Sequence, residues 1–113
     1  MSGRLPSGLL VGAMLRRVND AGGIGTVLAR GDDQAGAILV ITLEKGLNPR
    51  IWERGIGSSG AAELLNVGPQ ATDNQSEIYE YWRRRRARDP DLWVIELDIA
   101  QAERFAAETM SEG

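Results

Sequence analysis

The chain has 113 residues, of which 42% are hydrophobic, and a formal net charge of −3, so we expect one domain without the basic character of a general nucleic-acid binder. It contains no cysteine and no histidine, which excludes disulfides, Cys/His zinc sites, haem or iron–sulfur ligation, and catalytic triads or dyads that need imidazole or thiolate. Any metal would have to be a hard cation held by oxygen atoms, and we expect no cofactor.

The first predicted element is a helix, because apolar residues recur at helical spacing after Ser7, a good N-cap residue. Gly22 and Gly23 supply its C-terminal stop. Three strands are predicted next, at residues 24–30, 37–43 and 50–54, joined by turns at 31–36 and 45–49. The continuously apolar run 37–43 is typical of a central strand covered on both faces. In this order the three strands predict an antiparallel meander.

The second half of the chain begins with a glycine-rich loop at 55–60, and the segment 61–67 fits either a short strand or one helical turn. Thr72 and Gln75 have capping-box spacing and open a helix predicted to reach Arg88, which Pro90 prevents from continuing.

A last strand is predicted at 92–98, with Trp93, Ile95 and Leu97 on one face and the intervening residues on the other. Residues 101–108 predict a short terminal helix that frays. Together these elements predict a single α+β domain over residues 1–113, with a four- or five-stranded, mostly antiparallel and possibly mixed sheet, two main helices and a short C-terminal helix. No apolar run is long enough to span a bilayer, so we expect a cytoplasmic protein without a membrane contact.

The strongest candidate contact surface is the second helix, where an aromatic face runs into a cluster of arginines. Its candidate binding residues are Tyr79, Trp82, Arg83, Arg84, Arg86 and Arg88. They could bind phosphates or an acidic partner, with Tyr79 as a stacking group. Alternatively, the cations form a solvated helix end and complement the negative end of the helix dipole. Arg85 lies on the apolar face, and we expect it to pair with Asp89 or Asp91.

The acidic residues suggest little chemistry. Asp89 and Asp91 are expected to organise the turn around Pro90. The only constellation that resembles a magnesium site is Asp32, Glu44 and Glu96. Lys45 follows Glu44 directly, so on a strand the two side chains would point to opposite faces, which argues against a shared site.

Several segments together resemble domain of unknown function 1491, a family of short, uncharacterised bacterial proteins. The resemblance lies in Arg16-Arg17, Arg30-Gly31-Asp32 with Ala35-Gly36, Asp89-Pro90-Asp91-Leu92-Trp93-Val94 with Glu96, and Arg104-Phe105. It covers nearly the whole chain, least clearly at 55–72, and implies a small α+β domain without assigning a function. The turns that carry it hold Arg30, Asp32 and Gly36 in one case and Asp89, Asp91 and Trp93 in the other.

The leading hypothesis is therefore a non-enzymatic binding domain that contacts a protein partner or a second copy of itself as a homodimer, near residues 79–93. The second is binding of nucleic acid or phosphate through the arginines, and the third is a Mg²⁺-dependent nuclease or phosphodiesterase with the acidic site.

Overall fold

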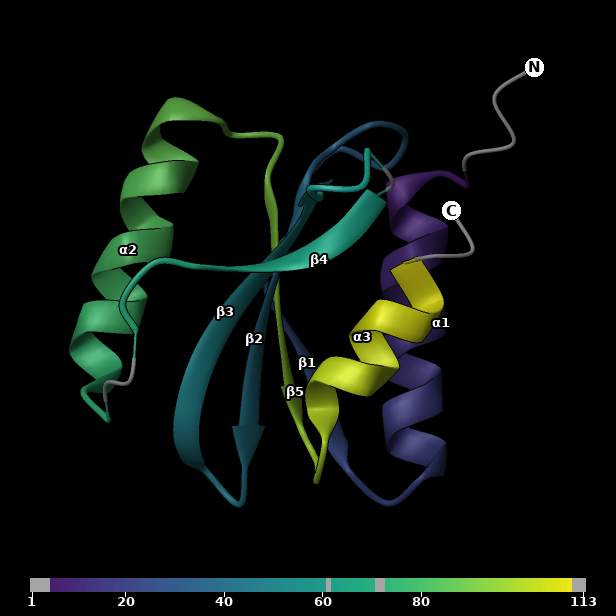
Figure 1. The fold of residues 1–113 in the computed structure, drawn as a ribbon, viewed down its shortest axis with the longest axis vertical. Helices are drawn as coiled ribbons and strands as arrows, with labels where there is room; N and C mark the ends of the chain where they lie inside the picture. Colours follow the sequence, from purple (N-terminus) through teal and green to yellow (C-terminus); the bar gives the residue numbers. More distant parts are fainter. Residues whose placement is uncertain (1–4, 61, 71–72, 111–113) are drawn as a thin grey trace.

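The protein is an α+β domain in which a five-stranded mixed sheet lies between helices (Figure 1). This computed structural model describes residues 5–60, 62–70 and 73–110. The elements in chain order are α1 (Ser7–Asp20), β1 (Ile24–Ala29), β2 (Ile38–Glu44), β3 (Leu47–Ile56), β4 (Ala62–Val67), α2 (Gln75–Arg88), β5 (Trp93–Asp98) and α3 (Ala102–Met110). None of the described helices is long and apolar enough to cross a membrane.

The strand order β1-β5-β2-β3-β4 corrects the predicted meander. The last strand inserts between the first two, antiparallel to β1 and parallel to β2, so β1 and β2 are not neighbours. β5 can occupy this position because its residues 93–95 and 97 are all buried, as a strand covered on both faces requires. The prediction of a mixed sheet is confirmed, and the segment 62–67 is a strand.

Two apolar clusters lie on opposite faces of the sheet. α1 and α3 cover one face, where Met14, Val18 and Ile95 are completely buried. α2 covers part of the other face, where it contributes Ile78 to a smaller cluster with Ile51. The alternation predicted for β5 is confirmed, since Trp93, Ile95 and Leu97 belong to the first cluster and Val94 to the second.

Two helix starts differ from their predictions. Ser7 is the first helical residue of α1, not the N-cap, and its hydroxyl donates to the carbonyl oxygen of Gly36. The amides of Ser7 and Gly8 instead donate to carbonyl oxygens of the loop that precedes β2. α2 is capped by Asn74, whose Oδ1 accepts from the Ser76 amide at 2.9 Å, while Thr72 lies outside the described residues.

Two further boundaries differ from the sequence analysis. Lys45 and Gly46 both have positive φ (53° and 75°), as a two-residue hairpin turn requires, so β3 begins at Leu47 and the turn is shorter than predicted. The terminal helix extends to Met110, two residues beyond its predicted end, and Ala106, Thr109 and Met110 are buried.

Candidate functional site

Tyr79 and Arg83 on the exposed side of α2, together with the half-buried Trp82 that packs against the sheet cluster, form an ordered group of side chains that we call the α2 patch. The rings of Tyr79 and Trp82 meet edge to face, with centroids 5.1 Å apart and an interplanar angle of 87°. The Arg83 guanidinium lies 5.3 Å from the centre of the Tyr79 ring. Tyr79 is 48% exposed, so the patch presents an aromatic surface to solvent with its side chains already oriented.

Arg85 lies on the sheet-facing side of the same helix, and its predicted pairing is wrong. Its guanidinium donates to both carboxylate oxygens of Glu53 on β3, each at 2.9 Å, and to the Tyr81 hydroxyl at 3.1 Å. The hydrogen bond to Glu53 is the main reason that the pKa of Arg85 is raised. Arg85 lies two helical turns after Ile78, on the face towards β3, and therefore points away from the turn that carries Asp89 and Asp91.

Arg86 attaches the end of α2 to the neighbouring strands. Its Nη1 lies 2.8–3.0 Å from the carbonyl oxygens of Arg30, Pro90 and Leu92. A guanidinium that donates hydrogen bonds to several backbone carbonyl groups has a structural role. Arg86 is thus held within the fold, although it belongs to the predicted binding cluster.

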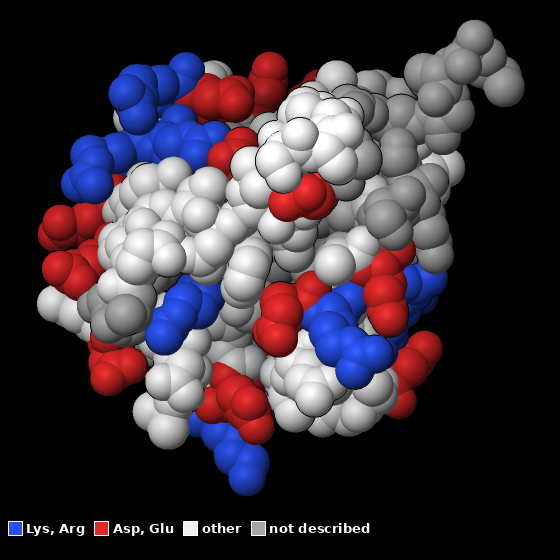
Figure 2. Space-filling model, viewed as in Figure 1, with Lys and Arg blue, Asp and Glu red and all other residues white. Residues whose placement is uncertain are grey.

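The remaining cations of the predicted cluster, Arg83, Arg84 and Arg88, are exposed. Figure 2 shows cationic side chains gathered over the upper left of the molecule, where α2 approaches its C-terminal end. The five arginines therefore separate into two that hold the helix on the sheet and three that face solvent.

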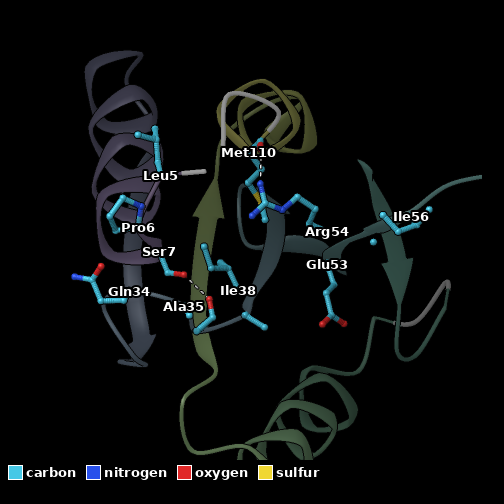
Figure 3. Close-up of a pocket in the computed structure, with 13 residues that line it drawn as sticks. Leu5, Pro6, Ser7, Gln34, Ala35, Ile38, Glu53, Arg54, Ile56 and Met110 are labelled. Carbon is cyan, nitrogen blue, oxygen red and sulfur yellow. Dashed lines mark hydrogen bonds between the residues drawn. The ribbon is translucent and has the colours of Figure 1, made fainter. Parts of the chain in front are cut away.

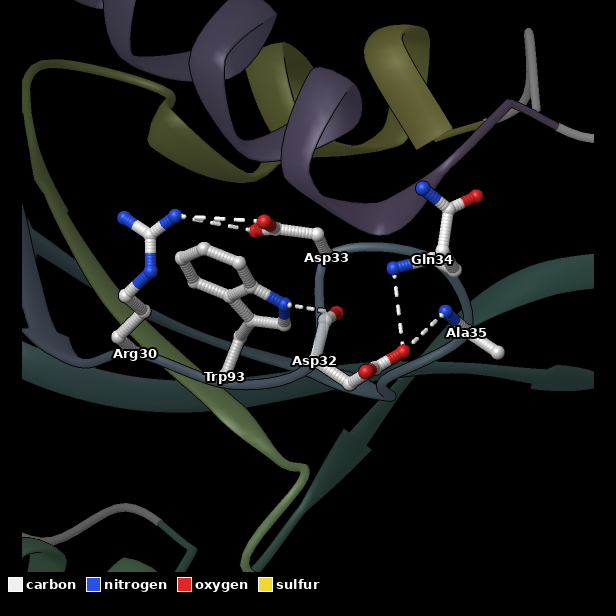
Figure 4. Close-up of polar contacts among 6 residues, drawn as sticks. All are labelled: Arg30, Asp32, Asp33, Gln34, Ala35 and Trp93. Atoms are coloured by element: carbon white, nitrogen blue, oxygen red, sulfur yellow. Dashed lines mark hydrogen bonds and ion pairs between the residues drawn. The ribbon is translucent and has the colours of Figure 1, made fainter.

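The two turns that carry the family resemblance meet in space (Figure 4). The Asp32 amide donates to the carbonyl oxygen of Asp91 at 3.0 Å, and the Trp93 indole donates to the carbonyl oxygen of Asp32 at 2.7 Å. The Asp32 carboxylate accepts from the amides of Gln34 and Ala35 and thereby closes its own turn. This contact runs through backbone groups and the Trp93 indole, and no arginine–aspartate pair joins these two described turns.

Glycine is required where these turns touch. A Cβ at Gly31 or at Gly36 would lie 2.2 Å from the carbonyl oxygen of Asp91, a distance that only glycine avoids. Arg30 covers the contact from outside, with its guanidinium 5.4 Å from the centre of the Trp93 ring and 3.2 Å from the Asp33 carboxylate. The motif residues are therefore explained by packing and turn geometry.

Two further acidic side chains, those of Asp89 and Asp98, also have structural partners. Asp89 accepts from the Asp91 amide at 3.2 Å, as expected of a residue that organises the turn. Asp98 accepts from the amides of Lys45 and Gly46 at 2.7 and 2.9 Å and holds the β2–β3 hairpin. Burial, and then the charge of Asp98, raise the pKa of Glu96.

The structure does not bring Asp32, Glu44 and Glu96 together. Asp32 lies in the loop before β2, whereas Glu44 lies at the opposite end of that strand. Within the described ranges, no three acidic side chains gather where a metal ion could bind.

A cleft of about 490 Å³ opens between the start of α1, the end of β3 and the end of α3 (Figure 3). Its walls include Ile38, Ile56 and Met110, and Arg54 donates across it to the Met110 carbonyl oxygen at 2.8 Å. The guanidinium is therefore committed to the end of α3 and does not form a dedicated ligand contact.

The most important functional feature that the sequence analysis missed is the partner of Arg85. Glu53 lies 32 residues earlier in the chain, so helical spacing could not identify it. A charged residue on an otherwise half-buried strand was the one available signal. Exposure of Tyr79, by contrast, follows directly from the helical period.

Comparisons with known proteins support the resemblance. A family model described as protein of unknown function (DUF1491) matches residues 5–107. A crystal structure of a DUF1491 family protein from Caulobacter crescentus CB15 is similar with a TM-score of 0.77 and 26% identity, covering 89% of this chain and 94% of that one. An NMR structure of a DUF1491 family protein from the same organism is similar with a TM-score of 0.74 and 26% identity, covering 89% of this chain and 91% of that one.

A solution structure of a protein from A. tumefaciens is similar with a TM-score of 0.67 and 28% identity, over 84% of this chain and 86% of that one. Among curated proteins, none matches this chain. The expected family is thus confirmed together with the fold, and the comparisons assign no activity.

Proposed function

We propose that this chain, which belongs to the DUF1491 family, is a non-enzymatic interaction domain of the cytoplasm that forms a homodimer and contacts a partner protein through the α2 patch. The lack of cysteine fits a reducing compartment. The lack of histidine removes the commonest general base at neutral pH.

The observation that carries the proposal is the ordered exposure of Tyr79 with Trp82 and Arg83. Aromatic residues and arginine dominate binding energy at protein interfaces. An edge-to-face aromatic pair contributes about 0.5–1.5 kcal/mol, and a cation over an exposed ring contributes about 0.5–1 kcal/mol. Both contacts orient the side chains before a partner arrives, which lowers the entropy cost of binding.

Site-directed photo-crosslinking in cells tests this proposal. We expect a photoreactive residue at Glu80, beside Tyr79 on α2, to give one discrete adduct with another protein. The same residue at Glu103, which is exposed on α3 on the opposite face of the sheet, is the matched control and should give none. The adduct should disappear when Tyr79→Ser and Arg83→Gln are combined. Equal labelling from both positions, or an adduct that survives the double change, would contradict the proposal.

Nucleic-acid binding is the second candidate, and the stacking of Arg83 on the exposed Tyr79 ring favours it. Three exposed arginines allow about three phosphate contacts, so the logarithm of the affinity should fall with the logarithm of salt with a slope of about −2.7 for a duplex or about −2.1 for a single strand. Replacement of Arg83, Arg84 and Arg88 by Gln should abolish that slope. An unchanged slope would exclude this surface as the nucleic-acid contact.

A further inference from the structure

The free edge of β1 differs from the other edge of the sheet. β1 ends the sheet on one side and β4 on the other. β1 contains no charged residue, and its Ile24, Val27 and Leu28 are 66%, 40% and 38% exposed. β4 carries Glu63, and its Leu64 and Leu65 are partly covered. Exposed apolar edge strands invite pairing with another strand, and proteins usually protect them with charges.

A groove of about 520 Å³ runs beside this edge, between β1 and α1. Leu9, Val27 and Trp93 give it apolar walls, and Arg30 with Asp33 lies at one end. Leu9 is 59% exposed, so the apolar surface of β1 continues onto the helix above it.

From this continuous surface we propose that β1 pairs antiparallel with β1 of a second copy of this chain, so that the two sheets join across a two-fold axis centred on Thr26, with Gly25 of each copy opposite Val27 of the other. This inference specifies the interface of the homodimer in the proposed function, and it uses a surface separate from the α2 patch.

The helices fit this arrangement. α1 packs across β1 and β5, close to the edge. Neighbouring strands lie about 4.8 Å apart. Each copy of α1 lies over β1 and β5 and is therefore set back from the edge, so pairing of the two β1 strands places the two α1 axes about 10 Å apart. This is near the 8–10 Å that separates the axes of packed helices. Leu15 packs over Gly25 and Leu9 lies near Val27, so the two-fold axis passes near Gly12. A glycine there permits close approach of the two helices.

The charges around the groove are complementary under the same axis. Arg16 is exposed, and its guanidinium lies over Gly12, 3.5 Å from where a Cβ would stand. Asp33 is exposed at the opposite end of the groove, beside Gly8. An antiparallel pair of α1 helices brings Arg16 of each copy to Asp33 of the other. The two-fold axis therefore creates two Arg16–Asp33 pairs between the copies, while Leu9 and Val27 of both copies fill the apolar groove.

Sedimentation of the full chain tests this inference. Wild-type protein should be a dimer. Combining Leu9→Lys with Ile24→Lys should raise its dissociation constant about a hundredfold or more, because each lysine would place an unpaired charge in a largely apolar interface. Leu47→Lys is the matched control, since Leu47 is 65% exposed on a strand far from β1, and it should leave the dimer intact. A monomeric wild type, or a dimer insensitive to the two lysines, would overturn the inference.

A charge exchange tests the register. Arg16→Glu and Asp33→Arg should each weaken the dimer, and the double variant should restore it, because the pair is re-formed with its signs reversed. Failure of the double variant to recover would overturn the proposed axis.

Hydrogen exchange of the wild-type chain needs no substitution. The amides of 24–29 should gain protection as concentration rises, whereas those of β4 should not. Equal behaviour of both edges would contradict the pairing. Tyr79→Ser should leave the dimer unchanged, so failure of the α2 contact and failure of this interface give different results.

Discussion

The two faces of the sheet are covered in different ways. On the face of α1 and α3, twelve buried residues form one apolar cluster. On the face of α2 the buried cluster has six residues, and α2 itself supplies only Ile78. The first face therefore depends on apolar burial, whereas α2 needs additional attachments.

Those attachments are arginine contacts. Arg85 binds Glu53, and Arg86 binds backbone carbonyl groups near the start of β5. These two side chains add directed polar contacts to the packing of Ile78, Tyr81 and Trp82, so the remaining surface of α2 can stay outside the core. The comparison shows how a helix can be fixed to a sheet and still present Tyr79 and Arg83 to a partner. Stability resides mainly on one face and the proposed contact on the other.

The largest expected effect lies on the α1 face. Met14 is completely buried, so Met14→Ala should lower the free energy of unfolding by about 2–5 kcal/mol through lost burial and the cavity left behind. Urea denaturation measures the loss. Ile78→Ala should cost less than Met14→Ala, and Leu47→Ala should cost less than about 0.5 kcal/mol because Leu47 is exposed. An Ile78→Ala loss equal to that of Met14→Ala would break the comparison between the faces.

An intermediate effect is expected at the end of α2. Arg86→Ala should lower the free energy of unfolding by about 1.5–3 kcal/mol, because three carbonyl groups, that of Leu92 part-buried, lose a charged donor. Arg83→Ala, on the exposed side of the same helix, should change it by less than about 0.5 kcal/mol. Urea denaturation followed by tryptophan fluorescence gives both values. Similar losses for the two arginines would show that the division between holding and exposed cations is wrong.

The smallest effect concerns Glu96, on the α2 face of β5. Its pKa is raised in the folded protein, so the folded state binds the proton more readily than the unfolded chain and the free energy of unfolding falls as pH rises through the interval above about 4.3. Glu96→Gln should therefore stabilise the protein at neutral pH, by less than about 1 kcal/mol because solvent screens this group. The gain should shrink towards pH 4 in thermal unfolding curves. A stabilisation by Glu96→Gln that does not depend on pH would have a cause other than the raised pKa of Glu96.

Local sequence patterns predicted the helices and strands well, but they predicted poorly which of these elements contact one another. The period of α2 placed Arg85 on the apolar face, and Arg85 does face the sheet, where it contacts Glu53. The insertion of β5 beside β2 was not predictable, because a strand that is apolar on both faces carries no information about its neighbours. The same holds for the site: Arg85 and Glu53 are joined only by the tertiary fold, and Arg86 contacts backbone carbonyl groups, which have no sequence signature.

The position of β5 has a consequence for synthesis of the chain. The strand that joins β1 to β2 is the last of the five to leave the ribosome, and Asp98 at its end also holds the β2–β3 hairpin. A nascent chain that stops before residue 93 therefore has an isolated β1, a β2-β3-β4 sheet and no strand to connect them. Such pairings between distant segments form slowly, so the domain completes its folding only after β5 has been translated.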